Sequence, residues 1–355
     1  MSDAVREIVI WAHSECRSNM ALYREVRRQA GVPVTVALWK YGETDGVRRL
    51  REAQGQAKGE YSDLSAVPVG DSLERGRELL AAHGGRGTVQ VFCVYQNSAV
   101  WRRLAVEAKR GGTRVVVSAE APCPMCVGAK AMLKRLYYRW MLPLKVRGVV
   151  GSADLFLNAS GRSGVAELRR LGWPAEKIVP FGYASDDSGC HPAAGSRAAS
   201  GGPLKILHTG MEAPYRGVAT LERAVAALRA GGRRVELRRT GGKAPAGEMP
   251  ALYGWADVFV ACGICEPWGI RVNDAIHAGL PVVVSRGMGA EWLVGQFGCG
   301  ATFAPGDAGE LASALGGFAD DAGRLAGARA GAMAAHEAWT PAARAAVWLD
   351  AVLGR

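Results

Sequence analysis

Short apolar runs alternate with longer segments whose apolar positions recur every three or four residues along most of the chain. The short runs are rich in Val, Ile and Leu and predict buried strands, whereas the longer segments predict amphipathic helices. Strands that alternate with helices are typical of parallel sheets covered by helices. The predicted strands are 8–12, 34–39, 89–95, 114–118, 155–158, 178–181, 205–208, 235–239, 258–261 and 282–285.

Helices are predicted between these strands, and one more closes the chain. Between 184 and 203 the sequence turns to Asp, Ser, Gly, Ala and Pro without apolar periodicity, which predicts a linker. The linker divides the chain into two Rossmann-like α/β halves. The predicted helices include 20–29, 98–110, 164–171, 217–230 and 341–353.

The composition agrees with two globular domains. A chain of 355 residues, 49% hydrophobic and 22% charged, can bury two full cores. No apolar run reaches the roughly 18 to 20 residues of a membrane span, and the first residues do not follow a signal-peptide pattern. We therefore expect a cytoplasmic protein, in which the eight cysteines are reduced.

The segment 266–285 holds the densest candidate chemistry. Glu266 and Asp274 stand eight positions apart, just over two helical turns, so both carboxylates can face one cleft. The amides of Trp268, Gly269 and Ile270 are expected at a helix start, which favours a diphosphate. Carboxylates that accept from hydroxyls, beside amides that donate to phosphate, predict a sugar-nucleotide site.

This segment resembles the E-x7-E signature of retaining glycosyltransferases of family 4, with Trp268 for the usual Phe and Asp274 for the second Glu. The similarity continues at 210–217, 253–260, 287–291 and 304–307. It covers residues 203–335 well and the first half of the chain only in outline. The signature residues present here are Glu266, Pro267, Gly269, Ala275, Gly279, Pro281 and Val282.

The resemblance implies a GT-B architecture: two Rossmann-like parallel-sheet domains with the active site in the cleft between them. Residues 1–184 would bind the acceptor and, after a linker at 185–203, residues 204–335 would bind the nucleotide sugar. Residues 336–355 would form a helix that crosses back to the first domain.

The implied activity is sugar transfer, with retention, from a nucleotide-diphosphate sugar to a saccharide or glycolipid acceptor, in surface polysaccharide or lipopolysaccharide assembly. No cofactor or metal is expected, because the chain lacks an Asp-x-Asp motif. Gly242 and Tyr253 are nearly adjacent, whereas the family separates the corresponding positions by a nucleobase-contacting loop. The identity of the base therefore cannot be transferred from the family.

On the donor side, the resemblance assigns sugar hydroxyls to Glu266 and ribose hydroxyls to Asp274. Arg216 replaces the phosphate-binding Lys of the family, and its planar guanidinium suits a diphosphate; the alternative is a solvated surface Arg. The backbone at Gly289 is expected near the phosphates.

The second basic position of the family is Met211 here, which cannot bind phosphate. Lys243, in a loop after a strand, could supply the missing charge, although a loop Lys is usually only exposed.

On the acceptor side, the polar loop after the first predicted strand suggests a site, because ligands of parallel sheets gather at the carboxyl ends of strands. His13 is a candidate base or acceptor-binding residue, or else a structural His. Ser18 could belong to this site or only cap the next helix. Glu120 ends another strand and is a candidate cleft residue, or else a salt-bridge partner in a loop.

Residues 121–153 contain six cations and no acid, interleaved with Met, Leu, Tyr and Trp. A basic helix of this kind suits an anionic membrane surface, as does the net charge of +11; we expect contact through 130–147. The alternative is a core helix with a solvated basic face. Nucleic acid is a poorer match, because no binding motif accompanies the charge. The cations are Lys130, Lys134, Arg135, Arg139, Lys145 and Arg147.

Two Cys-x-x-Cys pairs, Cys123/Cys126 and Cys262/Cys265, have spacing typical of metal or redox sites. A structural zinc ion would need both pairs together, and they are expected in different domains, so no metal site is predicted. Cys262 and Cys265 are interpreted as small packing residues, and a redox role is left open for the first pair.

Two other functions remain open. One is a sugar-nucleotide epimerase of GT-B fold, which would release a free sugar without an acceptor. The other is a non-catalytic binding protein, suggested by Met211, Asp274 and the shortened base region.

Overall fold

The computed structural model describes residues 4–14, 16–40, 60–93, 95–186, 202–242 and 244–355. The chain divides into a first unit, Met1–Pro122, Met132–Ala184 and Pro341–Arg355, and a second unit, Cys123–Ala131 and Ser185–Thr340. This division differs from the predicted domains in two places. The segment Cys123–Ala131 belongs to the second unit, and the terminal part of the first unit begins at 341 instead of 336. Most of the predicted linker lies outside the described residues.

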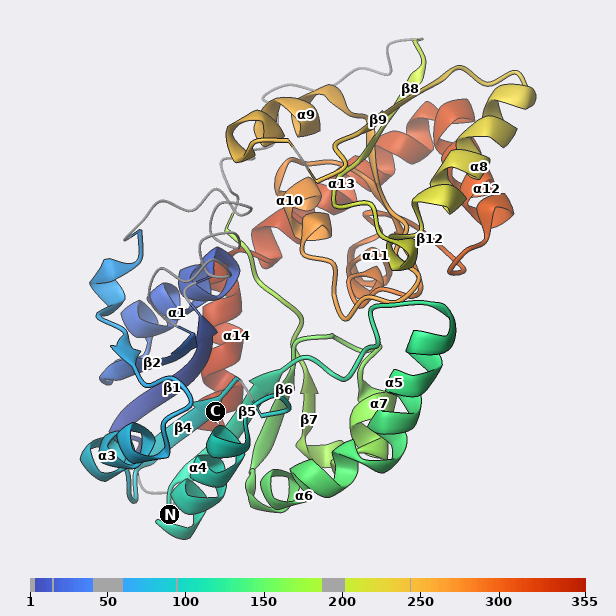
Figure 1. Cartoon of the computed structure of the whole chain (residues 1–355). Coiled ribbons are helices and arrows are strands. Elements are labelled where there is room, and N and C mark those ends of the chain that lie inside the picture. The colour runs from blue at the N-terminus through green and yellow to red at the C-terminus, as the bar shows by residue number, and fades with distance from the viewer. Residues whose placement is uncertain (1–3, 15, 41–59, 94, 187–201, 243) are drawn as a thin grey trace. The chain divides into compact units, whose positions relative to one another are not determined.

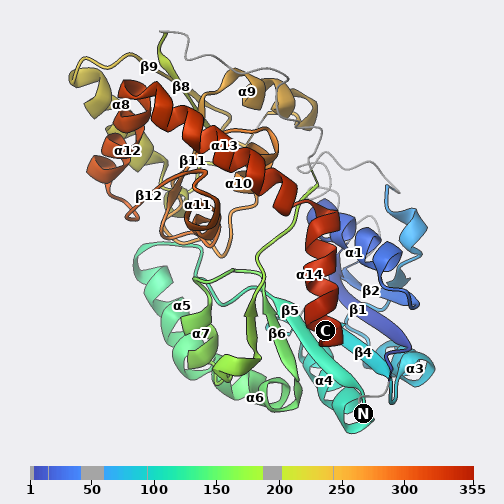
Figure 2. The ribbon, with the colours of Figure 1, turned by 180° about the vertical axis from the view of Figure 1, so that it is seen from behind.

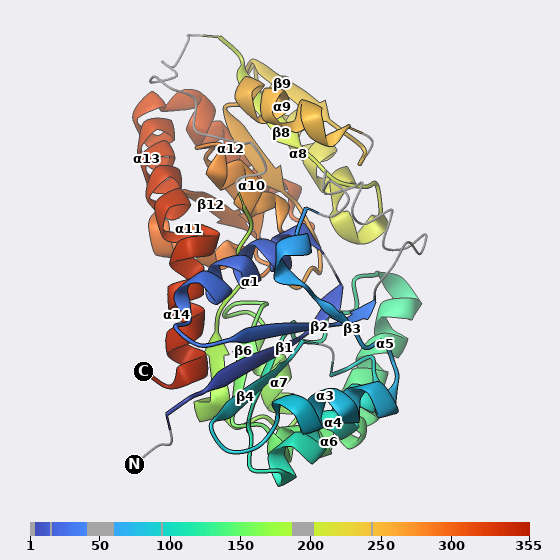
Figure 3. The ribbon, with the colours of Figure 1, turned by 90° about the vertical axis from the view of Figure 1, so that its left-hand side faces the viewer.

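The first unit is built on a seven-stranded parallel sheet of order β3-β2-β1-β4-β5-β6-β7. Helices α1 and α14 cover one face, and α3, α4 and α6 cover the other (Figure 3). Its elements are β1 (Glu7–Ser14), α1 (Arg17–Gln29), β2 (Val34–Lys40), η1 (Ser62–Leu64), β3 (Val67–Pro68), α3 (Leu73–His83), β4 (Thr88–Phe92), α4 (Ala99–Arg110), β5 (Arg114–Ala119), α5 (Gly128–Trp140) from Met132 onward, α6 (Leu142–Ser152), β6 (Leu155–Asn158), α7 (Val165–Arg170), η2 (Ala175–Lys177), β7 (Ile178–Pro180) and α14 (Pro341–Leu353).

Helices cover both faces of this sheet, so the side chains on both faces are buried and apolar. In β1, Ile8 and Ile10 belong to the core on one face, whereas Val9 and Trp11 belong to the core on the other. Successive side chains of a strand point to opposite faces, so a strand buried on both sides reads as a continuous apolar run. Trp11 stacks on Phe92 of the neighbouring β4, with ring centroids 5.1 Å apart.

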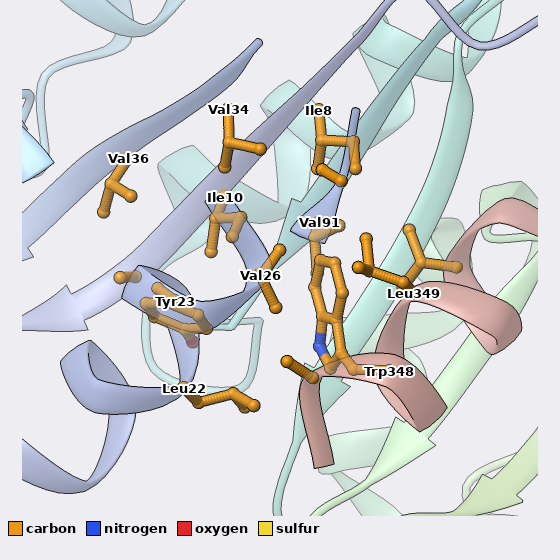
Figure 4. Packing of buried hydrophobic residues seen from close by; sticks show 14 of the residues in the cluster. Ile8, Ile10, Leu22, Tyr23, Val26, Val34, Val36, Val91, Trp348 and Leu349 are labelled. Carbon is orange, nitrogen blue, oxygen red and sulfur yellow. The ribbon is translucent and has the colours of Figure 1, made fainter. Parts of the chain in front are cut away.

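The terminal helix α14 packs on the first unit, beside α1 and β1 (Figure 1). Its first residue is Pro341, where the missing N–H has no helical partner to lose. Trp348 and Leu349 are buried in the same core as Tyr23 and Val26 of α1 (Figure 4). Arg344 Nη2 donates to the carbonyl of Phe181 at 2.7 Å, which adds a polar anchor.

The second unit holds a five-stranded parallel sheet of order β12-β11-β10-β8-β9. Helices α12 and α13 follow one another along the chain at the end of this unit (Figure 2). Its elements are β8 (Leu204–His208), η3 (Pro214–Arg216), α8 (Val218–Ala230), β9 (Val235–Arg239), η4 (Ala246–Glu248), α9 (Met249–Trp255), β10 (Val258–Ala261), α10 (Arg271–His277), β11 (Val282–Ser285), α11 (Glu291–Phe297), β12 (Gly300–Phe303), α12 (Ala308–Asp320) and α13 (Ala322–Ala338).

The structure confirms two parallel-sheet α/β domains, with differences at particular elements. β4 ends at Phe92, before the predicted 95, and Tyr95 instead packs edge-on against Phe156, with centroids 5.6 Å apart. α1 begins at Arg17 with Cys16 as its N-cap residue, so the interpretation of Ser18 as the cap is wrong. Strands β3 and β12 were not predicted.

Candidate functional site

Glu266 and Arg216 form an ion pair in the second unit, 50 positions apart in sequence. Arg216 Nη1 donates to Glu266 Oε1 at 2.5 Å, and only 23% and 10% of their side-chain surfaces are exposed. Arg216 ends the short η3 turn after β8, and Glu266 follows β10, the strand next to β8. Both therefore project from the carboxyl ends of parallel strands, where ligands of such sheets bind.

The backbone around this pair requires glycine at two positions. Gly217 has φ +69°, and a Cβ there would lie 1.9 Å from the carbonyl oxygen of Cys262. Gly269 has φ +104°, and its Cβ would lie 2.3 Å from Met288 Cε. A side chain at either position would strain the backbone, and at Gly217 it would also collide with the backbone that precedes Glu266.

Each side chain of the pair has one buried polar atom without a hydrogen bond to a described residue. Glu266 Oε2 and Arg216 Nε are buried and have no hydrogen-bond partner among the described residues. Burial raises the pKa of Glu266, and the neighbouring guanidinium of Arg216 opposes that shift. A buried donor or acceptor without a hydrogen bond lowers the stability of the folded protein. These two atoms are therefore candidates for hydrogen bonds to a bound ligand.

The expectation that helical spacing relates Glu266 to Asp274 is wrong. Helix α10 begins at Arg271 with Ile270 as its N-cap residue, so Glu266 stands in the preceding loop and is nearly buried. The reason is Gly269, whose positive φ interrupts the helix that the sequence pattern suggested.

Asp274 lies within α10, with 6% of its side-chain surface exposed, and its Oδ2 accepts from Arg271 Nη1 at 3.0 Å. The Trp268 side chain is buried, donates from Nε1 to Asn273 Oδ1 at 2.8 Å and stacks on Trp339. Any ligand contact of Trp268 would therefore come from its backbone, as it must for Gly269, which has no side chain.

Three other positions were considered for the phosphates of the nucleotide sugar. Gly289 is buried in the turn after β11, and its carbonyl accepts from the amide of Trp292 at 3.2 Å. Met211 is 61% exposed, and Lys243 lies outside the described residues.

His208 was missed in the sequence, although it is a polar residue that ends a predicted strand. It is buried at the end of β8, where Nδ1 lies 2.8 Å from the carbonyl oxygen of Val260, and Nε2 has no partner among the described residues. Burial lowers its pKa, and the positive charge of Arg216 lowers it further. His208 is therefore a neutral, buried group near Arg216.

In the first unit, His13 and Glu120 lie at the carboxyl ends of β1 and β5, which are both parallel neighbours of β4. His13 Nδ1 lies 3.0 Å from Ser14 Oγ, and its ring meets Trp39 edge-on. Burial, followed by the positive charge of Lys40, lowers the pKa of His13 to about 4. The carbonyl of Glu120 accepts from Gln96 Nε2 at 2.7 Å.

The carboxylate of Glu120 is hydrogen-bonded to Tyr183. Burial raises the pKa of Tyr183 well above its ordinary value, and the negative charge of Glu120 raises it further. The tyrosine hydroxyl therefore remains a proton donor to the carboxylate at neutral pH.

Residues 121–153, the basic segment, present apolar side chains to solvent. In α5 only Ala131 is buried, so the interpretation as a core helix is wrong. Tyr137 and Tyr138 pack partly against the core beneath, which leaves the other face of the helix open. Among the described residues, no helix is long and apolar enough to cross a membrane. The exposed apolar side chains of α5 and α6 are Met132, Leu133, Leu136, Trp140, Met141 and Leu144.

The two cysteine pairs are not kept apart as expected. Cys123 Sγ and Cys265 Sγ lie 2.7 Å from each other, because the segment Cys123–Ala131 belongs to the second unit. Cys262 is buried, as a packing residue should be, and donates to the carbonyl of Arg216 at 3.2 Å. Within the part of the chain that the structure describes, no group of three or more His, Cys, Asp or Glu side chains is arranged to hold a metal ion.

Several solved structures have the same fold as this chain. HepE of Anabaena, solved with UDP and glucose, superposes with a TM-score of 0.66 at 14% identity and covers 99% of this chain and 100% of its own. The fold is GT-B. Among other GT-B structures, the lipopolysaccharide outer core galactosyltransferase WaaB gives a TM-score of 0.63 at 11% identity, with 98% of this chain and 99% of that chain covered. Sucrose-phosphate synthase of Thermosynechococcus elongatus gives 0.60 at 15%, covering 98% and 97%.

Two similarities in sequence cover only part of the chain. The family model described as "Glycosyl transferases group 1" matches residues 234–327. An anthranilate phosphoribosyltransferase of Methylocella silvestris is 30% identical over 223 residues, which is 59% of each chain. This chain thus spans less than two thirds of that relative's length. The family match includes Glu266 and Asp274, and the structural similarities extend over both halves of the GT-B fold.

Proposed function

We propose that this GT-B protein is a glycosyltransferase that moves a sugar from a nucleotide-diphosphate sugar to a saccharide or glycolipid acceptor. The observation that supports it most is the buried Arg216–Glu266 pair with one unpaired polar atom on each side chain. A guanidinium with a free N–H matches an anionic diphosphate oxygen, and a carboxylate with a free oxygen matches a sugar hydroxyl. One donor molecule offers both groups.

In this proposal Arg216 binds the diphosphate and neutralises charge as it departs, which is the main source of catalysis. Glu266 accepts from hydroxyls of the donor sugar, and Asp274 accepts from the ribose. Backbone amides at Trp268, Gly269 and Ile270, together with Gly289, would complete the phosphate site. The reaction would retain the anomeric configuration and use neither a metal nor another cofactor.

The likeness to HepE, which was solved with UDP and glucose, supports a nucleotide sugar as donor. WaaB, a lipopolysaccharide galactosyltransferase by name, makes surface-polysaccharide assembly the setting we favour. His13 and Glu120 are proposed as acceptor-side residues. His13 is uncharged at pH 7, because its pKa is lowered to about 4, so it could accept a hydrogen bond from a hydroxyl.

A lipid-linked acceptor would be met at a membrane surface, and we propose that α5 and the start of α6 bind one. Trp140, Leu133 and Leu144 are more than 60% exposed, and the six cations of the segment have no acid among them. Exposed apolar side chains with surrounding cations match an anionic bilayer, where each cation contributes about 1 kcal/mol. The protein would then be peripheral on the cytoplasmic face.

Calorimetry with UDP, GDP and ADP tests the donor site. Arg216→Ala should weaken nucleoside-diphosphate binding by about 1–3 kcal/mol, and Arg216→Lys should restore much of that loss. Arg233→Ala is the matched control, because Arg233 forms an ion pair with Asp320 at the surface of the same unit. Equal affinity in wild type, Arg216→Ala and Arg216→Lys would remove Arg216 from the phosphate site.

A further inference from the structure

Cys123 and Cys265 lie side by side although 142 positions separate them. Their sulfur atoms are 2.7 Å apart, neither residue forms a disulfide bond with another described residue, and both are partly exposed. A disulfide bond is about 2.05 Å long, so the two sulfurs need to approach by only about 0.7 Å to reach bonding distance.

The segment that follows Cys123 contains two residues with left-handed backbone. Met125 has φ +48°, and Gly128, the first residue of α5, has φ +67°. Left-handed backbone is uncommon for a residue with a side chain, and it persists where surrounding structure stabilises it. The segment belongs to the same unit as Cys265, and the meeting of the two sulfurs is a contact within that unit.

We propose that Cys123 and Cys265 are a modification site, at which a mild oxidant forms a reversible disulfide. The two thiols lose two protons and two electrons and gain one S–S bond. A low-molecular-weight disulfide such as oxidised glutathione accepts the electrons and leaves as two thiols. Exchange proceeds by attack of one thiolate on the oxidant, followed by attack of the second cysteine on the mixed disulfide.

Other cysteines are less suited to this chemistry. Burial raises the pKa of Cys93, Cys262 and Cys299 to about 12 in each case, which suppresses the reactive thiolate. Cys126, three positions from Cys123, is the competitor, because it is partly exposed in the same segment.

If the proposed function is right, a disulfide between Cys123 and Cys265 would also change the geometry of the donor site. Cys265 directly precedes Glu266, and the amide of the preceding Ile264 donates to the carbonyl of Tyr215 at 2.7 Å, beside Arg216. Moving the sulfur of Cys265 therefore shifts the loop that positions the ion pair. Displacement of a site by about 1 Å can cost up to a hundredfold in rate, so we expect oxidation to slow transfer about tenfold, reversibly with dithiothreitol.

In the test, the protein is equilibrated with reduced and oxidised glutathione, its remaining thiols are blocked, and its tryptic peptides are mapped by mass spectrometry without reduction. Trypsin places Cys123 and Cys126 in peptide 115–130 and Cys262 and Cys265 in peptide 244–271. We expect the two peptides to be joined, with a mass two hydrogens below their sum. The joined species should persist in Cys126→Ser and in Cys262→Ser, which serve as matched controls.

Cys123→Ser and Cys265→Ser should each abolish the joined peptides. A glutathione adduct on Cys123 or Cys265 in place of the cross-link, a bond inside peptide 115–130, or two free thiols under oxidising conditions would overturn the proposal. Because the mass measurement needs no substrate, its failure is distinct from failure of the glycosyltransferase assignment. Unchanged transfer in fully cross-linked protein would refute the effect on the donor site alone.

Discussion

At the scale of single residues, Glu266 and Arg216 neutralise each other in a largely buried place, so removing either leaves the other without a partner. We predict that Glu266→Ala abolishes transfer and lowers the free energy of unfolding by about 1–3 kcal/mol, because the Arg216 guanidinium loses its acceptor. Glu266→Gln should abolish transfer at a smaller cost in stability. Urea unfolding and a transfer assay measure the two effects.

Asp320→Ala is the control for the stability effect, since its partner Arg233 lies at the surface, where water screens the ion pair and its loss should change the free energy of unfolding little. A Glu266→Ala protein with wild-type turnover would contradict the site. A Glu266→Ala protein as stable as wild type would contradict the burial of the pair.

His13 provides a test by pH. The folded protein holds the pKa of His13 at about 4, below its ordinary value of 6.5, so between these values the unfolded chain binds a proton that the folded protein does not. Stability should therefore fall as pH decreases through this window, by on the order of 1–2 kcal/mol given the partial exposure of the ring. His13→Gln should remove that part of the dependence. Urea unfolding at pH 7 and pH 4.5 measures it, and equal pH dependence in both proteins would contradict the burial of a neutral His13.

At the scale of elements, α14 ties the end of the chain into the core of the first unit. Trp348→Ala should lower the free energy of unfolding by about 3–5 kcal/mol, because a fully buried indole is lost. Trp348→Phe should cost much less, since it also removes an indole N–H that has no partner among the described residues. Val347→Ala, on the exposed face of the same helix, is the control and should cost less than about 0.5 kcal/mol. Similar losses at 347 and 348 would mean that the helix does not pack as described.

Most elements could be predicted because parallel strands buried on both faces read as continuous apolar runs. The bounds predicted for β6, β9, β10 and β11 match the structure. β3 has only two residues, one of them Pro, and β12 begins at Gly300, whose Cβ would lie 1.7 Å from the carbonyl oxygen of Val282. Both are edge strands without an apolar run, so hydrophobic periodicity could not reveal them.

The candidate site was less predictable than the fold. Arg216 and Glu266 were each expected from the signature, but not their ion pair, because pairing across 50 positions depends on how β8 and β10 are placed. The meeting of Cys123 and Cys265 depends on the course of the segment before α5, which has no apolar periodicity. His208 could have been found, since a polar residue at the end of a buried strand is itself a signal.

At the scale of the whole molecule, the basic segment should decide where the protein resides. Co-sedimentation with liposomes should require acidic lipid and should weaken as the Debye length falls toward about 3 Å in 1 M salt. Neutralising Lys130, Lys134, Arg135 and Arg139 together should release the protein and leave transfer to a soluble acceptor intact. Exposed Trp140 should retain a weak binding that resists salt.

A protein with the same change in charge elsewhere is the control. Arg75, Arg86, Arg110 and Arg169 are exposed in the first unit, and neutralising them should leave sedimentation nearly unchanged. Equal losses in both fourfold variants would mean that net charge, and not the surface of α5, attracts the protein to lipid.

We propose that this GT-B protein cleaves a nucleotide-diphosphate sugar at the Arg216–Glu266 pair. The most direct measurement is release of nucleoside diphosphate from a panel of UDP-, GDP- and ADP-sugars, with and without saccharide acceptors. We predict release from at least one donor, faster with an acceptor and absent in Glu266→Gln. Binding of donors without release would indicate a non-catalytic protein, and release of a free epimerised sugar without an acceptor would indicate an epimerase. Either result would contradict the assignment as a glycosyltransferase.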